Sequence, residues 1–98
     1  MTKKPLIGVE RAKILHDLHG WTEAKGRDAI TKIFQFKSFG QAWGWMSRVA
    51  LFAEKTDHHP EWFNVYGRVE VTLATHTAGG VTEKDIALAR KMNEYASG

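Results

Sequence analysis

The chain has 98 residues, of which 43% are hydrophobic and 26% charged, so it has room for one hydrophobic core and we expect a single domain over residues 1–98. Its 14 lysines and arginines outnumber its 11 carboxylates, but they are dispersed along the chain, which argues against direct binding of nucleic acid. The chain contains no cysteine, which excludes disulfide bonds and thiolate metal sites.

The first part of the chain predicts a helix followed by a hairpin. Residues 8–18 carry Ile14, Leu15 and Leu18 at helical spacing, and Gly20 is a natural stop. Segments 21–24 and 29–36 are rich in β-branched and aromatic residues and flank the glycine-containing turn KGRD. We therefore expect two antiparallel strands after the first helix.

A long helix is predicted from Ser38, its N-cap, to about Thr56. It ends before Pro60, which cannot continue a helix. The apolar stripe expected to lie on the sheet consists of seven residues: Phe39, Ala42, Trp43, Met46, Val49, Ala50 and Ala53. Three others then point away from the sheet and predict helix-to-helix association: Trp45, Leu51 and Phe52. The alternative is that one tryptophan simply lies flat on the surface.

The last part of the chain predicts a second hairpin and a third helix. Segments 62–66 and 68–75 lie on either side of Gly67, and the second alternates apolar and polar residues. TEKD at 82–85 matches a capping box that opens a helix through Tyr95. The fold class is therefore α+β in the order α-β-β-α-β-β-α, a four-stranded antiparallel sheet with three helices on one face.

Neither a secretory leader nor a membrane span is predicted. The N-terminus lacks an apolar leader core, and no segment has the roughly 20 consecutive apolar residues that span a bilayer. We expect a cytoplasmic protein with no membrane partner, with a nuclear pool as well if the source is eukaryotic.

Three histidines are expected to meet where the long helix and the last strand end. His58 and His59 follow the helix and His76 follows the strand, with Glu54 and Asp57 nearby. Imidazole gives and takes a proton near neutral pH, and a carboxylate can fix its tautomer, so the cluster predicts acid–base catalysis. A zinc or iron site is the alternative, although adjacent side chains at 58 and 59 tend to diverge. Isolated surface histidines remain the simplest alternative.

The spacing of this region resembles the signature of the pterin-4a-carbinolamine dehydratase family. The matching residues, separated by three, five, nine and eight others, are Glu54, His58-His59-Pro60, Tyr66, His76 and Asp85. RDAITKIFQFKSF, RVALFAEK and DHHPEWFNVY also resemble the family, so the resemblance extends from about residue 20 to residue 96. It implies that residues 1–98 form one dehydratase domain.

The resemblance also implies a reaction and an assembly. The reaction is dehydration of 4a-hydroxytetrahydrobiopterin, the 4a-carbinolamine, to quinonoid dihydrobiopterin in tetrahydrobiopterin recycling. The implied enzyme is a hydro-lyase that acts on a small pterin and uses no cofactor and no metal. The implied assembly is a homotetramer in which helix 38–56 packs through Trp45, Leu51 and Phe52.

Site residues are carried over from the family at matching positions. By this resemblance the catalytic histidines are His58, His59 and His76, which also bind substrate. The other residues expected in the substrate pocket are Asp57, Ala74, Thr75 and Thr77, with Glu54 and Trp62 as supporting residues. We expect His58 and His76 to act as acid and base and His59 to hold the pterin.

An interaction protein is the alternative function. Vertebrate relatives also act as dimerisation cofactors of a homeodomain transcription factor through the long-helix surface, so a homeodomain partner is a second expectation. One departure from those relatives is Lys84, where an arginine is expected. A lysine cannot make two parallel hydrogen bonds to one partner.

Overall fold

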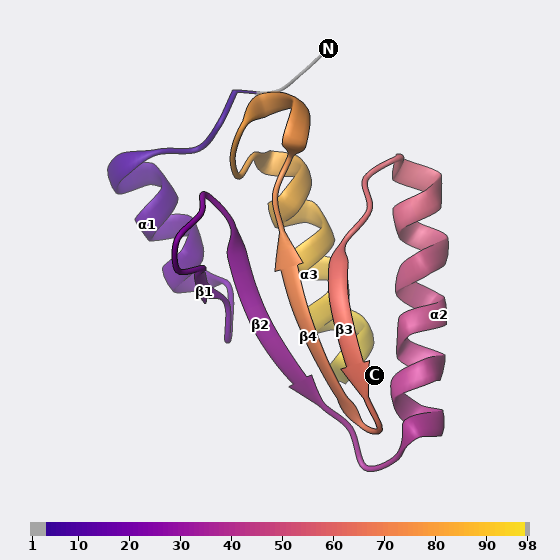
Figure 1. The fold of residues 1–98 in the computed structure, drawn as a ribbon. Helices are drawn as coiled ribbons and strands as arrows, with labels where there is room; N and C mark the ends of the chain where they lie inside the picture. Colours follow the sequence, from indigo (N-terminus) through magenta and orange to yellow (C-terminus); the bar gives the residue numbers. More distant parts are fainter. Residues whose placement is uncertain (1–3, 98) are drawn as a thin grey trace.

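The computed structural model describes residues 4–97, and its elements follow the predicted order (Figure 1). A short 3-10 helix, η1, is the one addition to that order. The elements are α1 (Gly8–Asp17), β1 (Thr22–Glu23), β2 (Ile30–Gln35), α2 (Phe39–Thr56), β3 (Glu61–Val65), β4 (Arg68–Leu73), η1 (His76–Ala78) and α3 (Glu83–Ser97).

The four strands form one antiparallel sheet in the order β1-β2-β4-β3. Ile30 pairs with Leu73 and Gln35 with Arg68, while Glu61 of β3 pairs with Thr72. The sheet therefore places the start of edge strand β3 beside the end of central strand β4, where η1 begins.

The hydrophobic core lies between one face of this sheet and helices α2 and α3. Val69, Val71 and Leu73 alternate along β4 and are fully buried, as the alternation predicts. Leu88 and Met92 of α3 belong to the same cluster of buried residues. Figure 1 shows α3 behind the sheet and α2 beside β3. The α+β prediction is confirmed.

The prediction for the large residues of α2 is partly wrong. Trp45 is only 5% exposed, its Nε1 donates to the carbonyl of Met92 at 3.0 Å, and its ring centroid lies 4.5 Å from that of Phe34. Phe39 and Trp43 are instead 53% and 58% exposed.

Helical geometry explains the error. The buried residues of α2 are Ala42, Trp45, Met46, Val49 and Ala53. At about 100° per residue these positions form one narrow stripe, and Phe39 and Trp43, which were expected to belong to it, lie beside it. Met46 and Val49 are buried and Leu51 is exposed, as predicted, whereas Phe52 is partly buried against the core.

Among residues 4–97, none of the helices is both long and apolar enough to cross a bilayer.

Candidate active site

The end of α2 turns the chain sharply at Asp57. This residue has left-handed backbone angles, φ 53° and ψ 44°, and its N–H donates to the carbonyl of Glu54 at 3.2 Å. The N–H of His58 donates to the carbonyl of Ala53 at 3.0 Å. These two bonds form a Schellman motif, which satisfies the last carbonyls of the helix and redirects the chain. The helix thus ends at Thr56, as predicted, and His58 emerges beside the start of α3.

A cavity of about 490 Å³ lies where the end of α2, the end of β4 and the start of α3 meet. This volume is in the range of small-molecule sites. Ten residues line it: Asp57, His58, His59, Pro60, Glu61, Ala74, Thr75, His76, Thr77 and Lys84. The structure therefore brings together all seven residues expected to bind substrate.

The two expected supporting residues lie outside this lining. Glu54 is on the last turn of α2, where its Oε1 lies 3.0 Å from Nε2 of His59. Trp62 is partly buried, and its ring centroid lies 6.1 Å from that of Trp45. Trp62 thus packs at the edge of the core.

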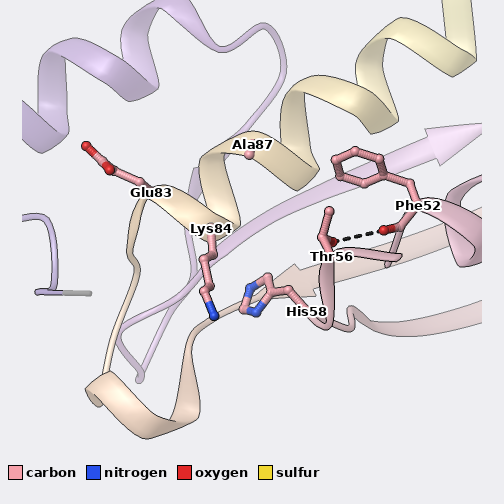
Figure 2. A pocket seen from close by; sticks show the side chains of 6 residues that line it. All are labelled: Phe52, Thr56, His58, Glu83, Lys84 and Ala87. Atoms are coloured by element: carbon pink, nitrogen blue, oxygen red, sulfur yellow. Dashed lines mark hydrogen bonds between the residues drawn. The ribbon is translucent and has the colours of Figure 1, made fainter. Parts of the chain in front are cut away.

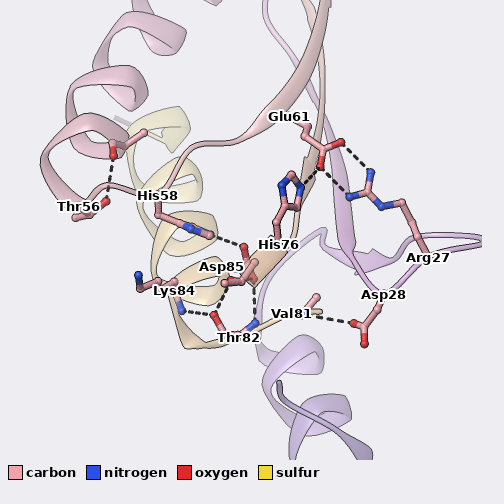
Figure 3. Close-up of polar contacts among 12 residues, drawn as sticks. Arg27, Asp28, Thr56, His58, Glu61, His76, Val81, Thr82, Lys84 and Asp85 are labelled. Carbon is pink, nitrogen blue, oxygen red and sulfur yellow. Dashed lines mark hydrogen bonds and ion pairs between the residues drawn. The ribbon is translucent and has the colours of Figure 1, made fainter. Parts of the chain in front are cut away.

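His58 is held by a buried carboxylate. Its Nε2 lies 2.6 Å from Oδ1 of Asp85, and the exposed fractions of the two side chains are 11% and 0% (Figure 3). His58 contacts Asp85 through Nε2, so Nδ1 is the ring nitrogen left for other partners.

The second oxygen of Asp85 is saturated by neutral donors. Oδ2 accepts from the hydroxyl of Thr75 at 2.8 Å and from the N–H of Thr82 at 2.9 Å. The Thr82 hydroxyl lies 2.7 Å from that of Thr75 and accepts from the N–H of Lys84 at 3.2 Å. Because the Thr75 proton is committed to Asp85, Thr82 donates to Thr75. This directed chain fixes the carboxylate before any substrate binds.

His76 is held by an exposed carboxylate that also binds an arginine. Nε2 of His76 lies 3.3 Å from Oε2 of Glu61, and the guanidinium of Arg27 contacts both oxygens of Glu61 at 2.8 Å. The hydrogen bonds from Arg27, and to a lesser extent the one from His76, lower the pKa of Glu61 to about 2. Glu61 is therefore ionised at neutral pH and accepts from His76.

The third histidine, His59, has the most exposed carboxylate partner, whereas the imidazole of His76 is itself the more exposed ring, at 78%. The exposed fractions of His59 and its partner Glu54 are 57% and 83%. Within residues 4–97, no group of three His, Cys, Asp or Glu side chains could hold a metal ion. The three imidazoles are thus directed to separate carboxylates and do not form one ligand set.

A second cavity, of about 350 Å³, adjoins the first between α2 and α3. Figure 2 shows its lining residues, with the amino end of Lys84 extended toward the imidazole of His58. His58 and Lys84 line both cavities and so separate them. The remaining residues that line the second cavity are Phe52, Thr56, Glu83 and Ala87.

Sequence reasoning missed three polar partners of the site. Asp85 had two signals, its place in the family signature and in the capping box, but only its capping role was inferred. Glu61 follows the histidines and Pro60 directly, which is a weak signal. Arg27 lies 34 residues from Glu61 in the sequence, and nothing in its surroundings indicates the contact.

Comparison with known proteins agrees with a site of acid–base chemistry built from oriented histidines. Residues 4–95 match the family described as "Pterin 4 alpha carbinolamine dehydratase". A relative from Brucella ovis that bears the pterin-4-alpha-carbinolamine dehydratase name is 55% identical over 96 residues, covering 98% of this chain and 99% of the relative.

Two solved structures are similar in fold. One, described as a transcriptional coactivator/pterin dehydratase from Brucella melitensis, is 56% identical with a TM-score of 0.93, covering 95% of this chain and 99% of that chain. The other, a pterin dehydratase-like protein identified as a RuBisCO assembly factor in the alpha-carboxysome, is 26% identical with a TM-score of 0.70, covering 82% of this chain and 93% of that chain. The match spans nearly the whole chain, so the protein belongs to the pterin-4a-carbinolamine dehydratase family, whose activity is that of a hydro-lyase.

Proposed function

We propose that the 490 Å³ cavity binds the pterin 4a-carbinolamine and that His58 and His76 carry out the proton transfers of its dehydration. The observation that carries this proposal is that both histidines line one cavity while each is bound to a different carboxylate. Two oriented imidazoles on one small-molecule site are what a metal-independent acid–base elimination requires.

The reaction needs one proton delivered and one removed. The C4a–O bond breaks as the departing hydroxyl takes a proton and leaves as water, and the pterin nitrogen bonded to C4a loses its proton as the new double bond forms. The electrons of the N–H bond become that double bond, so no covalent intermediate with the protein is needed. His58 and His76 each present Nδ1 for this exchange, because Nε2 of each is committed to a carboxylate. Either histidine serves as acid or base according to the face of the substrate.

His59 has a different proposed role. Its partner Glu54 is 83% exposed, against 44% for Glu61 beside His76 and 0% for Asp85 beside His58, so its tautomer is the most weakly fixed of the three. It therefore suits a group that holds the pterin by hydrogen bonds. Ala74, Thr75 and Thr77 complete the lining of the cavity.

The test is the rate of carbinolamine loss from freshly generated substrate, followed by absorbance with and without a chelator. His58→Ala and His76→Ala are each expected to lower turnover about a hundredfold, in line with the usual contribution of one acid–base group. His16→Ala, an exposed residue of α1, is the matched control. Unchanged turnover with weakened substrate binding would make the substituted histidine a binding residue and overturn its proposed role.

We further propose that α2 mediates self-association into a homotetramer. Its outer surface presents Phe39, Trp43 and Leu51, with exposed fractions of 53%, 58% and 75%. The rings of Phe39 and Trp43 are stacked with centroids 6.4 Å apart, which makes a continuous apolar patch. These exposed residues replace the interface predicted from the sequence, which consisted of Trp45, Leu51 and Phe52. Leu51→Glu is expected to dissociate the tetramer in analytical ultracentrifugation, and a wild-type monomer would contradict the proposal.

A second candidate function is the binding of a transcription factor of the homeodomain type. The same exposed patch on α2 supports it, as does the description of the Brucella melitensis relative as a transcriptional coactivator. A pull-down with a homeodomain protein, repeated with Leu51→Glu, tests it. Capture that survives this substitution would place the partner elsewhere.

A further inference from the structure

Three segments that are distant in sequence meet at one end of the strands. They carry Arg27, Glu61 and His76. Arg27 lies in the turn between β1 and β2, Glu61 begins β3 and His76 begins η1 after β4. Both terminal guanidinium nitrogens of Arg27 donate to Glu61, and Glu61 accepts from His76 (Figure 3). A planar fork of this kind fixes the direction of a carboxylate as well as its charge.

The turn that carries Arg27 is itself anchored. The neighbouring Asp28 accepts from Arg11 at 2.6 Å and from the N–H of Val81 at 3.2 Å. The hydrogen bond from Arg11 lowers the pKa of Asp28, so this anchor is charged at neutral pH. A side chain at Gly80 would collide with the Asp28 carboxylate, so the two segments are in close contact. Arg27 therefore projects from a fixed support.

We propose that Arg27 and Glu61 are positioning residues for His76, holding its imidazole with the proton on Nε2 so that Nδ1 is the nitrogen that exchanges a proton with the pterin. This inference rests on the proposed role of His76 in proton transfer. Arg27 also neutralises much of the charge of Glu61, so the carboxylate orients the ring without binding it as a full ion pair.

The proposal predicts that two variants have opposite effects on the stability of the His76 imidazolium. Glu61→Gln removes a negative charge beside His76, which disfavours the imidazolium. Arg27→Gln leaves the negative charge of Glu61 without its main partner, which favours the imidazolium. The limb of the pH–rate profile that follows His76 is therefore expected to move to lower pH in Glu61→Gln and to higher pH in Arg27→Gln. Shifts in the same direction, or no shift in either variant, would contradict this electrostatic coupling of the pair to His76.

Other charged groups around the cavity are unchanged in these two variants. Those lining the cavity with His76 are Asp57, His58, His59 and Lys84. Because they are common to all the proteins compared, they shift every profile equally.

The chain supplies a matched control for these variants. Arg68 and Glu70 form a second ion pair on the sheet at 3.0 Å, with exposed fractions of 42% each, against 43% and 44% for Arg27 and Glu61. Neither Arg68 nor Glu70 lines the cavity. Arg68→Gln and Glu70→Gln therefore remove the same kind of exposed ion pair without touching His76.

The experiment combines nitrogen-15 NMR of the imidazoles with steady-state kinetics. In the wild type, the ring-nitrogen shifts of His76 are expected to show the Nε2–H tautomer, and Glu61→Gln is expected to mix the two tautomers. Turnover should fall about tenfold in Glu61→Gln with little change in KM, with partial recovery of the Arg27→Gln loss in Arg27→Lys. Circular dichroism and thermal unfolding establish that each variant is folded.

The outcomes separate this inference from the proposed function. An Nδ1–H tautomer at His76 in the wild type, or equal effects in the Arg68 and Glu70 controls, would overturn the positioning role. If the tautomer depends on Glu61 while His76→Ala keeps full turnover, the positioning contact stands as geometry but the proposed role of His76 fails, and with it the catalytic part of this inference.

Discussion

His58 and His76 line the same cavity, yet each is oriented by different physical means. The carboxylate beside His58 is fully buried, 2.6 Å away and saturated by hydroxyl and backbone donors. The carboxylate beside His76 is 44% exposed, 3.3 Å away and bound by an arginine fork. In a buried setting neutral donors are enough to fix a carboxylate, because water does not compete for it. In an exposed setting a cation with two hydrogen-bond donors fixes the carboxylate instead.

This contrast is sharpest when the buried carboxylate is altered. Asp85→Asn replaces one acceptor oxygen by an NH₂ group, so either His58 or the Thr75–Thr82 side faces a donor. Turnover is expected to fall about a hundredfold or more, and the free energy of unfolding to fall by about 2 kcal/mol. Urea unfolding and carbinolamine loss measure the two effects, with the exposed Glu94→Gln of α3 as control. A destabilised variant with full turnover would reduce Asp85 to a helix cap.

A smaller effect is expected one step further from His58. Thr82→Val removes the hydroxyl that links Thr75 to the backbone of Lys84, and it removes an N-cap side chain. The expected loss is about 1–2 kcal/mol of unfolding free energy, with a smaller drop in turnover than in Asp85→Asn. Thr82→Ser keeps the hydroxyl and should restore most of both. Equal stability of the Val and Ser variants would show that the hydroxyl chain carries little energy.

Salt should distinguish the two carboxylates further. Raising the ionic strength to about 1 M shortens the Debye length from about 8 Å to about 3 Å, which weakens exposed ion pairs more than buried ones. The turnover ratio of wild type to Glu61→Gln is expected to shrink about twofold in high salt, whereas the ratio of wild type to Asp85→Asn stays constant. Similar changes in both ratios would remove the distinction between the two settings.

The smallest expected effect is the acid dependence of the exposed pair. The pKa of Glu61 is lowered from 4.5 to about 2 in the folded protein, chiefly by the hydrogen bonds from Arg27. Its contribution is therefore fully present above pH 4.5 and is lost as the pH falls from 4.5 through 2. Because the pair is exposed, the expected change in melting temperature is small. The melting temperatures of wild type and Glu61→Gln, measured across this pH range, should converge in acid. A difference in melting temperature that grows in acid would contradict the predicted direction.

Much of this molecule follows from short-range patterns in the sequence. Alternation along β4, the end of α2 before Pro60 and the capping box at Thr82 all depend on neighbours a few residues apart, and all three were predicted. On α2 the predicted stripe correctly held Ala42, Met46, Val49 and Ala53, but the aromatic side chains of Phe39 and Trp43 were included in it and Trp45 was left out. Side-chain size was therefore a misleading guide, because the angular position around the helix determines which residues are buried.

The site itself divides along the same line. His58 and His59 were found in one local motif and His76 from its place after the last strand, and the family resemblance supplied Thr75 and Thr77. The partner carboxylates depend on how distant segments meet: Asp85 lies 27 positions after His58, and Arg27 reaches Glu61 across the sheet. No local pattern encodes such contacts, so the structure was needed to assign them.

Asp85 accepts from the amide of Thr82, the residue before α3, with the same oxygen that accepts from Thr75, and its other oxygen holds His58. Fraying of the first turn of α3 would therefore release the imidazole at the same moment. The hydrogen-exchange rate of the Thr82 amide then reports the fraction of molecules in which the site is assembled. A pterin that binds only the assembled form should slow this exchange in proportion to its occupancy, so a single backbone amide can serve as a probe of ligand binding.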